Sequence, residues 1–139
     1  AGLPLRSPRG GFVFVFQTGV PLFRRYDAEG RLLYQRHIEG PEIDDVVNNL
    51  PTHWPTRRDE GREMPLVPPV VRAARVDASG RLWVSFAARP YTYVYADNGE
   101  KQRAVQFRGA GIVSPTSLSF SGTGRLLVTP GCYEFDPGV

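Results

Sequence analysis

Short apolar runs alternate with glycine-containing polar turns along most of the chain, a pattern typical of antiparallel β-structure. The run Phe12–Phe16 is aromatic or β-branched throughout and predicts a buried strand. The same pattern predicts strands over residues 12–16, 20–26, 31–38, 70–77, 81–86, 91–95, 101–107, 114–120, 125–129 and 132–135. The chain therefore belongs to the all-β class.

The turns repeat one another. Residues 26–33, 76–83 and 120–127 each contain an aromatic or β-branched residue, a polar turn, a glycine and an arginine that begins the next strand, and 95–101 is a looser version. Glycine suits this place because it adopts the left-handed conformation without strain. Gly80 and Gly124 are 44 residues apart, and the blades of a β-propeller repeat at about 40–45 residues.

Two motifs carry a resemblance to a known family. VDASGRLWVS at 76–85 and YVYADNGEKQRAVQF at 93–107 resemble the two hairpins of a blade in the six-bladed β-propeller superfamily, which contains the NHL-repeat and TolB-like proteins. The resemblance covers most of the chain apart from residues 41–67. It implies β-propeller blades, which are four-stranded antiparallel sheets, with one short helix in an inserted loop.

The resemblance also predicts how residues 1–139, a single propeller-like domain or a fragment of one, are divided. Residues 70–107 form a complete blade, residues 11–38 and 114–135 form partial blades, and the ring is incomplete. The chain is thus expected to hold about two and a half blades and to begin and end inside a blade. A β-sandwich or a meander with similar hairpins is the alternative.

The insertion, residues 41–67, is the first candidate for specificity, because propeller function usually lies in loops. Residues 41–50 predict a helix, and residues 51–69 predict an irregular loop. The candidate partner-binding residues here are His53, Trp54, Arg57 and Arg58. Tryptophan and arginine are common interface anchors, although Trp54 could equally pin the loop to a blade.

Three tyrosines form the second candidate surface. Tyr91, Tyr93 and Tyr95 alternate along one strand, so they share a sheet face. Such a face could bind a sugar or a protein partner, but packing between neighbouring sheets is the simpler expectation. Trp83 is expected in the core.

Charge and composition exclude some classes of function. The net charge is +3, but the arginines are scattered among acidic residues, so no nucleic-acid binding is expected. The longest apolar run, residues 11–16, is far shorter than a membrane span, so no transmembrane segment is expected. The single cysteine, Cys132, cannot form an internal disulfide and leaves the compartment open, with the cell envelope or periplasm favoured over the cytoplasm.

No residue pattern predicts catalysis. The sequence has no Gly-x-Ser-x-Gly motif, and His37 and His53 lack further ligands at metal-binding spacing, so no cofactor or metal is expected. The predicted function is a non-catalytic interaction or scaffold subunit, whose partners are other protein subunits or a second copy of the chain. Two alternatives stay open. One is part of a lactonase- or lyase-type propeller enzyme with a divalent metal in its channel, and the other is an envelope-associated ligand-binding propeller.

Overall fold

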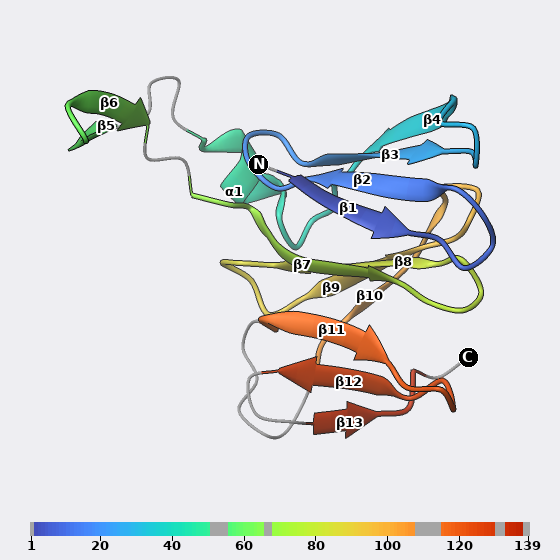
Figure 1. The fold of residues 1–139 in the computed structure, drawn as a ribbon. Coiled ribbons are helices and arrows are strands. Elements are labelled where there is room, and N and C mark those ends of the chain that lie inside the picture. The colour runs from blue at the N-terminus through green and yellow to red at the C-terminus, as the bar shows by residue number, and fades with distance from the viewer. Residues whose placement is uncertain (1, 51–55, 66–67, 108–114, 130–132, 138–139) are drawn as a thin grey trace.

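The computed structural model describes residues 2–50, 56–65, 68–107, 115–129 and 133–137. Over these residues the protein is all-β, as the sequence predicts, with three larger antiparallel sheets, one two-stranded hairpin and one short helix. The larger sheets are stacked face to face, and the hairpin stands apart from the stack (Figure 1).

The first sheet contains four consecutive strands, each antiparallel to the next: β1 (Gly2–Arg6), β2 (Phe12–Phe16), β3 (Leu22–Tyr26) and β4 (Leu32–His37). The three strands expected over 11–38 are present as β2, β3 and β4, and the sheet contains one further strand, β1, that was not predicted. That strand contains Pro4, a residue normally absent from sheets. Proline is tolerated here because β1 is an edge strand.

The second and third sheets follow the predicted ranges. The second contains β7 (Val71–Val76), β8 (Leu82–Phe86), β9 (Thr92–Tyr95) and β10 (Lys101–Val105), which match the four strands expected over 70–107. The third contains β11 (Ser117–Phe120), β12 (Leu126–Thr129) and β13 (Tyr133–Phe135). Every sheet is therefore a meander in which strands adjacent in sequence are adjacent in space.

The second sheet lies in the middle of the stack (Figure 1). All five residues of β8 are buried, because neighbouring sheets cover both of its faces. Across the first interface, the rings of Phe23 and Tyr95 lie 5.0 Å apart, and across the second interface those of Trp83 and Phe120 lie 5.6 Å apart. Trp83 is 1% exposed, which confirms its predicted place in the core.

The two faces of each sheet are distinguished here as front and back. The back faces the sheet that follows in sequence, and the front is the opposite side. In β2, Val13 and Val15 are fully buried on the back, whereas the phenylalanines alternate with them on the front, where Phe12 is 38% exposed. The prediction of a buried strand at Phe12–Phe16 is therefore correct for the back face only.

The three sheets repeat one unit. In each first hairpin a glycine of positive φ closes the turn, at Gly10, Gly80 and Gly124. Each donates its N–H to the carbonyl three residues earlier, on Ser7, Asp77 and Ser121 respectively. Gly10 and Gly80 are 70 residues apart, and removing the 27 residues of the insertion leaves 43, close to the 44 between Gly80 and Gly124.

The insertion contains α1 (Asp44–Asn48), shorter than the predicted helix, and the hairpin of β5 (Thr56–Asp59) and β6 (Arg62–Pro65). The expectation of an irregular loop over 51–69 was wrong for residues 56–65. Glu60 and Gly61 both have positive φ, as a two-residue hairpin turn requires. This strand pair was missed because its residues are mostly charged and lack the apolar alternation that predicts strands.

Candidate interaction surface

The base of the insertion is held by the apolar side of α1. Ile43 is 1% exposed and belongs to the core between the first and second sheets, and Val47 and Leu50 pack against that core. Ile43 and Asp44 donate backbone N–H groups to the carbonyl of Gly40, and Asp44 Oδ1 accepts the N–H of Gly40 at 2.8 Å. The predicted helical face therefore anchors the insertion to the sheets.

A polar cluster fixes the approach to α1 on the second sheet. The Tyr93 hydroxyl donates to Glu42 Oε1 at 2.6 Å. Lys101 Nζ lies 3.5 Å from the centroid of the Tyr93 ring, donates to the carbonyl of Glu39 at 3.1 Å, and is 3.9 Å from Glu42 Oε1. A Cβ atom on Gly40 would collide with both the Tyr93 hydroxyl and the Lys101 ammonium group, so this close approach requires glycine.

The protonation of the cluster follows from these contacts. The hydrogen bond from Tyr93 is the main cause that lowers the pKa of Glu42, and the charge of Lys101 adds to it. Burial raises the pKa of Tyr93, and the hydrogen bond to the Glu42 carboxylate raises it further. At neutral pH Tyr93 therefore stays protonated, and its hydroxyl donates a hydrogen bond to the ionised carboxylate of Glu42. This arrangement is a hydrogen bond between a neutral phenol and a carboxylate.

Beside α1 runs an apolar groove of about 130 Å³. Its walls include Val46 and Leu50 from the insertion, Phe86 from the second sheet and Val70, which immediately precedes β7. At its rim, Arg89 Nη2 contacts Asp45 Oδ2 at 2.5 Å, which ties α1 to the segment after β8. The insertion is thus joined to the second sheet by apolar packing, by Glu42 and by Asp45.

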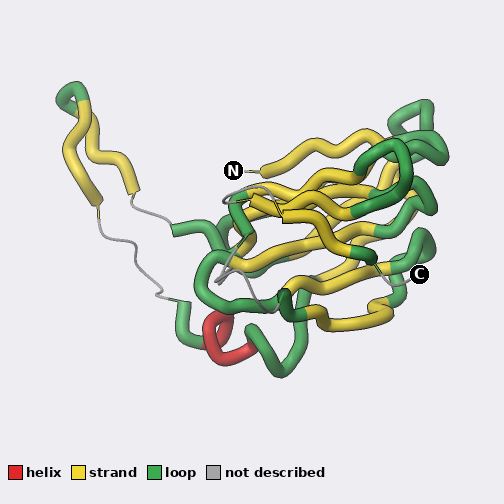
Figure 2. Tube along the Cα trace, turned by 90° about the horizontal axis from the view of Figure 1, so that it is seen from below, coloured by secondary structure: helices red, strands yellow, loops and turns green. Residues whose placement is uncertain are grey.

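The hairpin β5–β6 lies beyond this anchored base and extends away from the stack in both views (Figures 1 and 2). Its two strands pair only with each other among the described strands. Of the predicted partner-binding residues, Arg57 and Arg58 lie on β5, opposite Met64 and Glu63. His53 and Trp54 lie outside the described residues, as does Cys132.

The predicted tyrosine surface lies inside the stack. Tyr93 is 0% and Tyr95 3% exposed, and both belong to the core between the first and second sheets, against which the partly buried Tyr91 packs. The rings of Phe86 and Tyr93 lie 4.8 Å apart. In this structure the three tyrosines pack between sheets, and Tyr93 additionally orients the insertion through Glu42.

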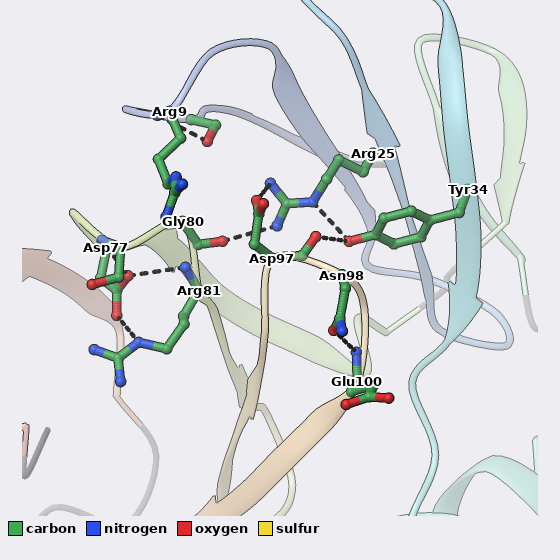
Figure 3. A network of polar contacts seen from close by, with 11 residues as sticks. Arg9, Arg25, Tyr34, Asp77, Gly80, Arg81, Asp97, Asn98 and Glu100 are labelled. Carbon is green, nitrogen blue, oxygen red and sulfur yellow. Dashed lines mark hydrogen bonds and ion pairs between the residues drawn. The ribbon is translucent and has the colours of Figure 1, made fainter.

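A second network, which the sequence analysis did not identify, joins the first and second sheets (Figure 3). Arg25 is 4% exposed, and its guanidinium donates to the carbonyl of Gly80 at 3.0 Å and to the Tyr34 hydroxyl at 2.8 Å. It also contacts Asp97 Oδ1 at 3.2 Å. The Tyr34 hydroxyl in turn donates to the carbonyl of Asp97 at 2.6 Å. The sequence offered one signal for this network. Arg25 follows Phe23 by two residues in a predicted strand, so the two side chains share a sheet face.

The described residues contain neither a metal-binding cluster nor a membrane-spanning helix. No three His, Cys, Asp or Glu residues within the described ranges are grouped so that they could hold a metal ion. No helix among those ranges is long and apolar enough to cross a membrane.

Comparison with known proteins shows a likeness among solved structures. No protein-family model matches the chain, and no curated protein matches it. Among solved structures, a protein of unknown function from Bacteroides caccae superposes with a TM-score of 0.57 at 16% sequence identity. The match covers 99% of this chain and 43% of that protein, so the chain spans less than half of that protein's length. At this identity the likeness extends to the fold alone.

Proposed function

We propose that the three sheets are blades of a β-propeller and that the chain acts as a non-catalytic interaction or scaffold subunit. The observation that carries this proposal is the insertion, in which a helix packed on the sheets is followed by a hairpin that projects from a stack of repeated sheets.

The repeat supports the blade assignment. Two of the sheets are four-stranded antiparallel meanders, and the first-hairpin turns of all three recur at 43–44 residues once the insertion is set aside. This period and this strand order are those of propeller blades. Face-to-face stacking of successive sheets is the arrangement that a propeller requires.

The hairpin supports the interaction role. An isolated two-stranded hairpin is marginally stable in water at best, and β5–β6 has no third strand among the described residues. A partner that covers the hairpin would supply the missing contacts. Its sequence carries charges of both signs, with Arg57 and Arg58 followed by Asp59, so a polar partner surface that also carries both signs is favoured.

The anchored base would make such binding efficient. Glu42 and Asp45 hold the start of the insertion to the second sheet through Tyr93 and Arg89. A segment whose base is fixed loses less conformational freedom when it binds, so more of its contact energy becomes affinity.

The test is cross-linking of the tagged chain in its source cells, followed by mass spectrometry. We expect cross-links from residues 56–65 to another protein, and we expect Arg57→Glu combined with Arg58→Glu to reduce its recovery at least about tenfold. Arg31→Glu, whose side chain is 75% exposed on the first sheet, is the matched control and should leave recovery unchanged. Recovery that is insensitive to the double variant would contradict the proposal.

A further inference from the structure

The hairpin β5–β6 has two outer edges, and neither is paired with a third strand among the described residues. The hairpin lies in the interior of the chain and extends away from the stacked sheets in both views (Figures 1 and 2). The edge of a strand presents backbone N–H and C=O groups with which a further strand can pair. Whether an edge can accept a strand depends on which of its backbone groups point outward.

The register of the hairpin determines the direction of these groups. Asp59 lies opposite Arg62, and the two residues between them form the turn. In an antiparallel pair closed by a two-residue turn, the residues next to the turn exchange both backbone hydrogen bonds, and bonded pairs then alternate with non-bonded pairs. Two pairs of the hairpin are therefore non-bonded, namely Arg58 with Glu63 and Thr56 with Pro65. The backbone groups of these pairs point outward.

The two edges differ because one of them contains proline. On β5, Thr56 and Arg58 each direct a backbone N–H group outward. On β6 only Glu63 does so, since Pro65 has no N–H group. A strand added to β6 would lose one hydrogen bond and meet the proline ring, and proline on an edge strand is a common block to such pairing. The edge of β5 is therefore open to a further strand, whereas that of β6 is blocked.

We propose that the partner protein adds an extended segment of its own chain to the outer edge of β5, as a third strand. This inference rests on the proposed function and specifies how the partner binds the hairpin. In such recognition the backbone hydrogen bonds supply affinity and the facing side chains supply selectivity. The sequence of β5, Thr-Arg-Arg-Asp, would be complemented by a segment with carboxylates opposite the arginines and a basic residue opposite Asp59.

The charges of β5 argue against a second copy of the chain as the source of this strand. Two antiparallel registers use the outward groups and pair three residues of β5 with the same three of another β5. One register places Arg57 opposite Arg57 of the second copy, and the other places Arg58 opposite Arg58. Like charges directly opposite each other destabilise a strand pair. A different protein can avoid this repulsion, and it would convert the marginal hairpin into a more stable three-stranded sheet.

The test compares proline on the two edges, with recovery of proteins cross-linked to the tagged chain in its source cells as the measurement. Arg58→Pro removes an outward N–H group of β5 and leaves the bonded pairs intact, so we expect recovery to fall at least about tenfold. Glu63→Pro is the matched control, because Glu63 is the opposite member of the same pair. It should stay within about twofold of wild type, since it changes only the edge that is already blocked.

A second pair of variants separates the backbone from the charge of the side chain. Thr56 is uncharged and exposed, and it is the first residue of β5, where proline is tolerated. Thr56→Pro should lower recovery, whereas Thr56→Val keeps the N–H group and should not. Amide hydrogen exchange gives a further readout, measured on the free chain and on the complex isolated through the tag. The N–H groups of Thr56 and Arg58 should become protected in the complex, and that of Glu63 should not.

Three results would overturn the inference. The first is equal recovery of Arg58→Pro and Glu63→Pro, whether both fall or neither does. The second is unchanged exchange at Thr56 and Arg58 in the complex. The third is a dimer of the purified chain that Arg58→Pro dissociates, because the added strand would then come from a second copy. If the proline variants have no effect but Arg57→Glu combined with Arg58→Glu still reduces recovery, the proposed function stands and only this mode of binding fails.

Discussion

The Arg25 guanidinium donates a hydrogen bond of 3.0 Å to the carbonyl of Gly80, across the interface between the first and second sheets. The donor comes from β3 and the acceptor from the turn that closes the first hairpin of the next sheet. This hydrogen bond is directional and therefore helps to set the relative position of the two sheets. The apolar packing that otherwise joins them is non-directional.

Arg25→Met should destabilise the fold. The change leaves the Gly80 carbonyl and the Tyr34 hydroxyl without this donor, and lost partners of buried polar groups cost about 1–3 kcal/mol. Asp97 adds little because its side chain is 53% exposed and stays hydrated. Urea unfolding measures the loss. Arg31→Met on the exposed turn is the control and should change the free energy of unfolding by under about 0.5 kcal/mol. Equal effects of the two variants would disprove a role for Arg25 in joining the sheets.

Gly40→Ala should loosen the insertion from the second sheet. The added Cβ would collide with the Tyr93 hydroxyl and Lys101, and relieving such overpacking costs about 1–3 kcal/mol. Hydrogen exchange of the backbone amides in residues 43–50 should rise. Gly122→Ala has open space around its Cβ and serves as the control. Unchanged exchange in the Gly40 variant would show that the polar cluster does not hold α1.

Asp77 supports the first hairpin of the second sheet. It is 4% exposed, its Oδ2 accepts bonds from Arg81 and Trp83, and its Oδ1 accepts two N–H groups of the turn. Asp77→Ala should cost about 2–4 kcal/mol, because these donors lose their acceptor. Asp77→Ser should recover part of that loss, since serine at the equivalent positions Ser7 and Ser121 accepts one turn N–H. Chemical denaturation of both variants measures this. Identical losses would refute the equivalence of the turns.

Acid should weaken the attachment of the insertion through Glu42. Its pKa is lowered in the folded protein, chiefly by the hydrogen bond from Tyr93, so its stabilising contribution is complete above the pKa of the unfolded chain. That contribution is lost as the pH falls through the folded pKa, below the ordinary value of 4.5. Glu42→Gln should therefore flatten the fall in stability below about pH 5. Glu60→Gln on the exposed hairpin turn is the comparison, and an equally flat profile there would contradict this role for Glu42.

Features formed by residues that are neighbours in the chain were predicted from the sequence, whereas contacts between distant residues were not. Hairpin turns such as that at Gly99 were predicted because the turn residues and both strands are adjacent in the chain. Strand β1 was missed because Pro4 argues against a strand in a sequence of this kind. Contacts such as Tyr93 with Glu42 were not predictable, since the partners are 51 residues apart and no periodicity links them. The Phe12–Phe16 run predicted a buried strand, and among the described residues only the side of Val13 and Val15 is fully buried.

The account's central claim is that this chain works within an assembly, and native mass spectrometry of the protein from its source, followed by its denatured mass, tests that claim most directly. The account predicts a native particle heavier than the denatured polypeptide that contains this sequence. A stably folded, monodisperse 15.5 kDa monomer without a partner would contradict it.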